Sequence, residues 1–219
     1  MKHEFGIERQ PHFKEPWPDA FKYFSWIEYA VTLPYPTYLI TTLKENGKPN
    51  AAWWSWGCFS GKGYRPGPGG QAYYSLLVSA EGGHTCDNIL RTGEWCINLP
   101  SLEHHERCEQ TIKHNGMDDD EITDAGFTVE PSRVIQAPRI AECRVNMECR
   151  LEWHKPLVEG SCHLVVVGKI VHVAMDEQAC VADPRQRLAG LNTMFNVMET
   201  LDPLIGETGP SGLGIVRLP

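Results

Sequence analysis

The stretch HTCDNILRTGEWCINLP, His84–Pro100, decides the fold together with PYPTYLITTLKENGKPNAAWWSWG, Pro34–Gly57, which precedes it. The earlier stretch predicts a strand over residues 38–43, because β-branched and aromatic residues suit a pleated, half-buried surface. The Asn-Gly pair at 46–47 tolerates positive φ and favours a tight hairpin. A second strand is therefore expected over residues 50–56.

The later stretch predicts a short helix followed by a strand. A Gly-Gly pair at 82–83 frees the backbone just before His84 and Thr85, and polar residues of this kind favour helix starts. Unpaired amides and the helix dipole make such a start attractive to an anion. Gly93 is expected to end the helix, and residues 95–99 to return as a strand.

The order of these motifs resembles one known family. An LITT strand, an NGKPNAAW hairpin, an SWG segment and HTCDNILRTGEWCINLP follow one another as in the flavin reductase-like, FMN-binding split-barrel proteins, including the flavoredoxin branch. The similarity continues through Ala125–Trp153 and Cys162–Val173 and covers about residues 30–175. It implies a mainly β fold with peripheral helices, namely an FMN-binding split β-barrel of Greek-key topology.

Three parts of the chain are expected on this basis. Residues 1–33, rich in proline and aromatic residues, form an N-terminal arm, and residues 34–180 form the flavin reductase-like barrel domain. Residues 181–219 form a C-terminal helix and tail that pack on the barrel or on a dimer partner. Apolar residues at helical spacing predict that this helix covers residues 185–201.

Two further segments have a clear pattern. Residues 142–153 alternate strictly between apolar and polar side chains, which predicts a long barrel strand with one face either wet or against a partner. Residues 60–71 are too rich in glycine and proline for regular structure. Family members usually have a shorter link here, so this insertion is a departure from the family pattern.

The resemblance also implies a set of cofactor-binding residues. The strand at 50–56 is expected to run beside the isoalloxazine ring, and the helix start at 84–88 to hold the phosphate. The candidates are Asn50, Ala51, Trp54, Ser55, Trp56, His84, Thr85 and Asn88. A hydroxyl, a side-chain amide and a helix N-terminus are suitable donors to a dianion. The alternative interpretation is that Thr85 and Asn88 only cap a short helix.

His163 is the candidate catalytic residue, because the resemblance places it near the reactive face of the flavin. A satisfied strand histidine without a chemical role is the competing interpretation. Lys169 stands where many relatives have an acidic residue, so no role is carried over to that position.

Several functions fit the resemblance. The first is an oxidoreductase that uses NAD(P)H to reduce FMN, and the second is a flavoredoxin-like electron carrier that acts with a redox protein partner. A third is a relative that has lost the flavin or binds another planar cofactor. No GxGxxG motif follows a strand, so the nicotinamide would bind only transiently over the flavin. A homodimer is expected, since a split barrel leaves edges that a twofold partner can cover.

Composition excludes several classes of partner and location. The chain of 219 residues has 20 basic and 28 acidic residues, a formal charge of −8, which disfavours nucleic-acid binding. The longest apolar run, Leu164–Met175, is too short to span a bilayer, and the first six residues lack a signal-peptide core. We therefore expect a cytoplasmic protein without nucleic-acid or membrane partners.

The eight cysteines include no CxxC pair, and no metal site is predicted, although His104, His105, Cys108 and His114 form a weak candidate cluster.

Overall fold

The chain divides into two compact units in a computed structural model, which describes residues 2–61, 72–113 and 115–217. The larger unit comprises Thr37–Met194 and Ile215–Pro219, and the smaller comprises Met1–Pro36 and Phe195–Gly214. These boundaries differ from the predicted ones, because the chain after residue 180 is shared between the two units. Most of the predicted loop at residues 60–71, and His114, lie outside the described residues.

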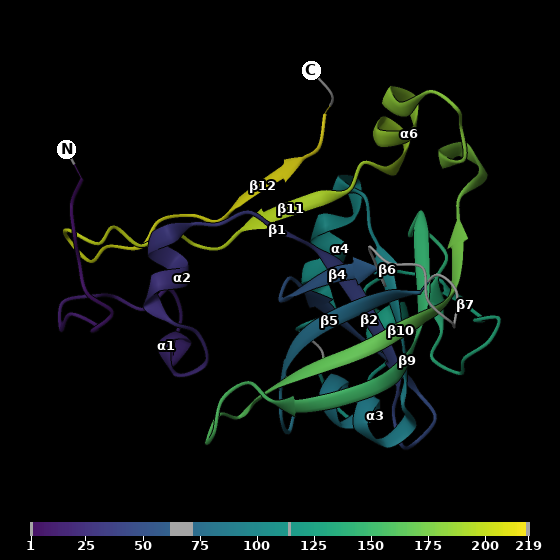
Figure 1. Cartoon of the computed structure of the whole chain (residues 1–219), viewed down its shortest axis with the longest axis horizontal. Helices are drawn as coiled ribbons and strands as arrows, with labels where there is room; N and C mark the ends of the chain where they lie inside the picture. The colour runs from purple at the N-terminus through teal and green to yellow at the C-terminus, as the bar shows by residue number, and fades with distance from the viewer. Residues whose placement is uncertain (1, 62–71, 114, 218–219) are drawn as a thin grey trace. The chain divides into compact units, whose positions relative to one another are not determined.

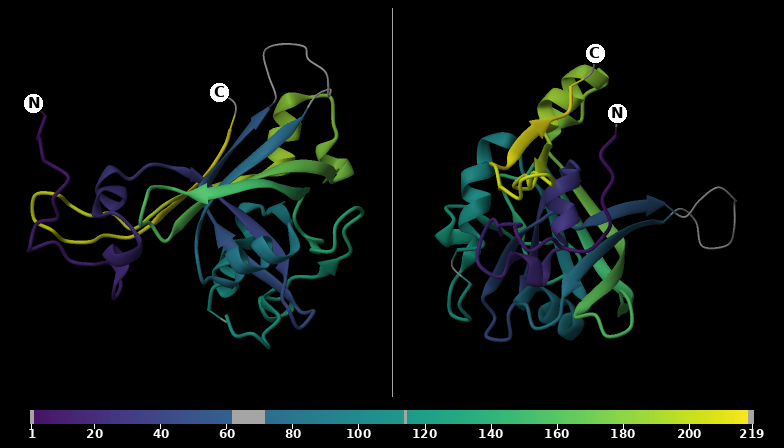
Figure 2. Two further views of the ribbon diagram at one scale, coloured as in Figure 1. Left: turned by 60° about the horizontal axis from the view of Figure 1, so that its bottom comes forward. Right: turned by 90° about the vertical axis from the view of Figure 1, so that its left-hand side faces the viewer.

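The larger unit is built on a seven-stranded antiparallel sheet in the order β3-β2-β6-β9-β10-β5-β4 (Figure 1). Its strands are β2 (Tyr38–Leu43), β3 (Pro49–Trp54), β4 (Gly57–Gly61), β5 (Tyr73–Ala80), β6 (Glu94–Leu99), β9 (Val145–Pro156) and β10 (His163–Met175). The two outermost strands, β3 and β4, are joined by only Ser55 and Trp56, so the sheet must curl back on itself. Figure 2 shows this curvature from two further directions. The prediction of a mainly β, split-barrel fold is confirmed.

The hairpin between β2 and β3 forms as its sequence predicts. Gly47 has φ +82°, the left-handed conformation that favours glycine, and the amide of Lys44 donates to the carbonyl of Lys48 at 2.8 Å. The register pairs Tyr38 with Trp54, where β3 ends, two residues earlier than predicted.

Short helices and one small sheet surround the barrel. They are α3 (His84–Thr92), η1 (Leu102–His104), α4 (His105–Gln110), α5 (Glu121–Asp124), η2 (Glu177–Ala179), α6 (Pro184–Leu191) and the β7 (Val129–Glu130) and β8 (Arg139–Ile140) pair. Helix α3 ends at Gly93, whose φ of +71° is again left-handed, and β6 follows at once. The predicted helix-then-strand order over residues 84–99 is therefore present.

Hydrophobic side chains are buried on both faces of the central strands. Along β2, Tyr38 and Ile40 join one core cluster with Trp95, while Leu39 joins a second cluster with Ile122 on the opposite face. Alternation of successive side chains across a strand explains this division. Strand β2 thus sits between two layers of packing, which fixes the position of its neighbour β3.

Strand β9 departs from the prediction that its polar face is either exposed to water or packed against a partner. Glu148 is fully buried because the segment before β8 covers it: the amides of Arg133 and Val134 donate to its carboxylate, each at 2.8 Å. Arg139 forms an ion pair with the same carboxylate at 2.5 Å. Burial raises the pKa of the Glu148 carboxyl, but these hydrogen bonds outweigh it and hold that pKa below its usual range. On the face predicted to be polar, Asn146 and Glu148 are therefore buried, whereas Arg150 is exposed.

The smaller unit contains α1 (Ala20–Tyr23), α2 (Trp26–Val31) and a three-stranded sheet of β1 (Tyr35–Pro36), β11 (Met194–Val197) and β12 (Gly212–Ile215). Its core gathers Phe13, Ala20, Trp26, Tyr29 and Leu201. The predicted helix over residues 185–201 is wrong in its second half. Asn192 takes φ +44° and ends α6, and the chain then pairs with β1 as strand β11.

Candidate functional site

A cavity of about 220 Å³ opens in the larger unit where β3, the end of β5 and the start of α3 meet. Its described lining residues are Asn50, Ala51, Ala52, Trp54, Ser79, Ala80, Gly83, His84, Thr85, Cys86, Thr111, Ile112 and Asn115. Five of the eight predicted cofactor-binding residues are in this set. The structure therefore brings together two segments that are more than 25 residues apart in the sequence.

Strand β3 supplies one wall of the cavity. Asn50, Ala52 and Trp54 are at alternate positions and share one face of the strand, whereas Trp53 packs with the opposite core cluster. The indole Nε1 of Trp54 donates to the carbonyl of Trp56 at 3.0 Å, which fixes the ring. This wall is flat and apolar, apart from Asn50 at its end.

The N-terminus of α3 supplies the polar end of the cavity. The N-cap is Gly83, which has no side chain to accept hydrogen bonds from the first-turn amides. The side-chain amide of Asn50 donates to Oγ1 of Thr85 at 3.1 Å, so the hydroxyl proton of Thr85 is left for another acceptor. Nδ1 of His84 is buried and has no hydrogen-bond partner among the described residues.

The remaining wall was not predicted from the sequence. Thr111, Ile112 and Asn115, which follow α4, also line the cavity. The hydroxyl of Thr111 donates to the carbonyl of Cys108 at 2.7 Å, so it serves the loop rather than a ligand. The alternation of Ala52 with Asn50 and Trp54 could have identified Ala52, but nothing local in residues 111–115 indicates that they reach the barrel.

The cavity lining is nearly neutral. Among its described residues none is Asp, Glu, Lys or Arg, and the ionisable side chains are His84 and Cys86. Burial raises the pKa of the Cys86 thiol, so it stays protonated at neutral pH. The N-terminus of α3 therefore supplies positive potential at this site.

Three predicted cofactor residues do not line the cavity. Ser55 and Trp56 lie beyond the end of β3, and the side chain of Asn88 is used inside the protein. Asn88 donates to Oγ1 of Thr42 at 3.0 Å and accepts from Arg91 at 3.1 Å. Asn88 does not cap α3, whose caps are Gly83 and Gly93, and its side chain instead links α3 to Thr42 on β2.

His163 also lies outside the cavity lining, although it is close in register. It pairs across the sheet with Ala80, which does line the cavity. Its ring meets that of Trp56 edge to face at 5.4 Å, and its Nε2 is buried without a hydrogen-bond partner among the described residues. A catalytic role for His163 stays a prediction.

Two further properties concern the described residues as a whole. They contain no group of three or more His, Cys, Asp or Glu side chains arranged to hold a metal ion. None of their helices combines the length and the apolar character needed to cross a membrane.

The sequence and the fold are both similar to known proteins. The family model of the flavin reductase like domain matches residues 74–189. An uncharacterized protein of Methanothermobacter thermautotrophicus is 31% identical over 148 residues, which are 66% of this chain and 65% of the relative. The match thus spans just under two thirds of that relative's length.

Two solved structures show the same fold. Nitrilotriacetate monooxygenase component B from Bacillus cereus has a TM-score of 0.70 and 18% identity, covering 99% of this chain and 98% of its own. Flavoredoxin from Desulfovibrio vulgaris (Miyazaki F) has a TM-score of 0.63 and 17% identity, covering 85% of this chain and 90% of its own. At these identities the likeness concerns the fold.

Proposed function

Because the chain belongs to the flavin reductase like domain family, we propose that it is an FMN-binding flavoprotein oxidoreductase that takes electrons from NAD(P)H. The single observation that carries this proposal is the cavity beside α3, where an uncapped helix N-terminus meets a flat apolar strand wall. A phosphate suits the first feature and a planar ring suits the second.

The residues present fit this cofactor. The first-turn amides of α3, the hydroxyl of Thr85 and the unpartnered Nδ1 of His84 would hold the phosphate. Ala52 and Trp54 would cover one face of the ring. FMN supplies the electron-transfer chemistry when bound, and the protein contributes binding, orientation and exclusion of water.

The electron donor is tested by anaerobic reduction of the FMN-loaded protein. We expect the visible flavin absorbance to bleach on addition of NADH or NADPH much faster than that of free FMN at the same concentration. Bleaching by dithionite but by neither nicotinamide would contradict the reductase activity and support the flavoredoxin-like carrier, which acts with a redox protein partner. A chain that binds no FMN would contradict both.

We also propose that the chain is a homodimer. The cavity of about 220 Å³ is smaller than an FMN molecule, so part of the bound cofactor would lie outside it. A second protein chain would shield that part from solvent. Val171, Val173 and Met175 share one face of β10 and are 36–49% exposed, which gives a second copy an apolar surface to cover. Light scattering should give twice the chain mass at micromolar concentration; a single-chain mass would contradict the dimer.

The cytoplasm is the proposed location. All eight cysteines are unpaired, which is typical of proteins in a reducing compartment.

A further inference from the structure

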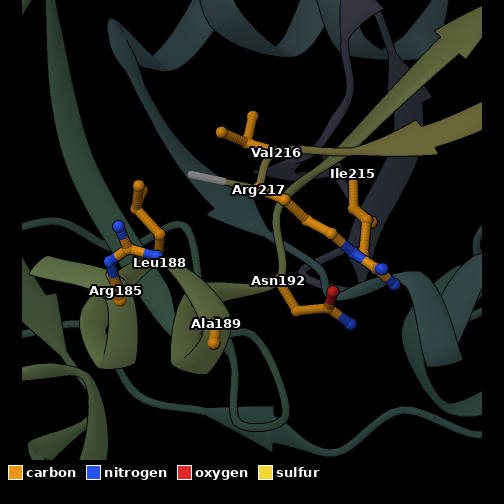
Figure 3. A pocket seen from close by; sticks show the side chains of 7 residues that line it. All are labelled: Arg185, Leu188, Ala189, Asn192, Ile215, Val216 and Arg217. Carbon is orange, nitrogen blue, oxygen red and sulfur yellow. The ribbon is translucent and has the colours of Figure 1, made fainter. Parts of the chain in front are cut away.

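A second cavity, of about 370 Å³, lies in the larger unit between α6 and the C-terminal segment. Figure 3 shows its lining residues, Arg185, Leu188, Ala189, Asn192, Ile215, Val216 and Arg217. The side chains of α6 stand on one side, those of residues 215–217 on the other, and Asn192 between them. This cavity shares no lining residue with the cavity beside α3.

Two arginine side chains give this cavity its charge. In the described part of the chain, neither Arg185 nor Arg217 has a side-chain ion pair or hydrogen bond, and no acidic residue lines the cavity. The neighbouring acid, Asp183, uses its carboxylate to accept from the amides of Arg185 and Gln186, at 2.7 and 3.1 Å, as the N-cap of α6. The two guanidinium groups therefore remain available to an anion from outside.

Apolar side chains supply the rest of the surface. Leu188 on α6 faces the cavity together with Ile215 and Val216 on the opposite side, and Val216 is 40% exposed. Asn192 is held in place because it ends α6 in a left-handed conformation, and its amide adds a neutral donor and acceptor. Charge and hydrophobic surface thus occur together in a space large enough for a small organic molecule.

We propose that this cavity binds a small organic anion, an acidic group on a short apolar chain, through the guanidinium groups of Arg185 and Arg217, whose exposed side chains stand on opposite sides of the cavity and would turn toward the acidic group. Guanidinium binds carboxylate and phosphate in a bidentate, charge-assisted manner, and Leu188, Ile215 and Val216 would cover the hydrocarbon part. This site would be independent of the proposed flavin cavity, because the two share no residue.

Calorimetric titration of the full chain with sodium octanoate tests this site. We expect saturable binding with a Kd of about 1 mM or tighter. Arg217→Gln and Arg185→Gln should each weaken binding by about tenfold, because each removes a charge-assisted hydrogen bond. Arg187→Gln is the matched control on the same helix, since the Arg187 side chain donates to the carbonyl of Val181 at 3.0 Å and does not line the cavity.

Three comparisons decide the outcome. Octyl phosphate in place of octanoate shows which acidic group is preferred, and binding of either one supports the site. Inorganic phosphate and octan-1-ol should each bind at least about tenfold more weakly, because each lacks one half of the ligand. The proposal would be overturned if octanoate did not bind, or if Arg187→Gln weakened its binding as much as the other two variants do. Displacement of octanoate by FMN would also overturn it, but would leave the proposed flavin binding unaffected.

Discussion

Replacing Lys44 by methionine is expected to lower the free energy of unfolding by about 3–5 kcal/mol, because it leaves a buried carboxylate without its counter-ion. Lys44 and Glu121 are each 1% exposed, and Nζ lies 2.8 Å from Oε1 of Glu121. The same ammonium donates to the carbonyls of Gly116 and Asp119, at 2.7 and 2.9 Å. Chemical denaturation of wild type and variant measures the loss.

Two variants make this result specific. Lys48→Met, at the exposed position opposite Lys44 across the turn, should change stability by no more than about 0.5 kcal/mol, because the hydrogen bond from the Lys48 ammonium to the carbonyl of Asp118 is exposed to solvent. Lys44→Met combined with Glu121→Leu should recover much of the loss, since both charges are then absent. A Lys44→Met protein as stable as Lys48→Met would show that the buried pair contributes nothing.

The loss should also depend on pH. Burial raises the pKa of Glu121, and Lys44 opposes that rise, so removing Lys44 should raise this pKa further. A carboxyl whose folded pKa exceeds its unfolded value of about 4.3 binds a proton more tightly when folded. The deficit of Lys44→Met should therefore be largest at neutral pH and shrink as the pH falls through the folded pKa.

Replacing Ala52 by tryptophan is expected to weaken FMN binding by at least about 100-fold, or about 2.7 kcal/mol. Ala52 points into the cavity from the same face of β3 as Trp54, and it is only partly buried, so an indole would fill the space without entering the core. Ala52→Ser changes the same position with little added volume and should bind FMN nearly as well as wild type. Circular dichroism should show both variants folded.

The local sequence was sufficient to predict the turns, helix ends and strands that depend on neighbouring residues alone. The Asn-Gly turn at 46–47, the end of α3 at Gly93 and the strands on either side depend on backbone preference and on the period of apolar residues. The apolar period gave a wrong prediction at residues 194–197, which pair with β1 as a strand and do not continue the helix. Apolar spacing alone cannot distinguish a helix face from a short strand that follows a left-handed residue.

Contacts between segments that are distant in the sequence could not be predicted from it. Glu121 ends an acidic run at 118–121, and nothing in that run indicates that its last member is buried against Lys44, 77 positions earlier in the sequence. The cover over Glu148 likewise comes from a loop without a distinctive pattern. In the candidate site, the family resemblance implied that Asn50 and Thr85 both bind the cofactor, and the structure brings them together. No motif indicates Thr111, Ile112 and Asn115, which line the same cavity.

Fluorescence titration of FMN with the purified chain, run in parallel with Ala52→Trp and Ala52→Ser, tests the central claim most directly. Saturable quenching or enhancement of flavin fluorescence is predicted for wild type and Ala52→Ser, and its loss for Ala52→Trp. Equal binding by all three proteins would place the flavin outside this cavity, and no binding by wild type would contradict the flavin assignment itself.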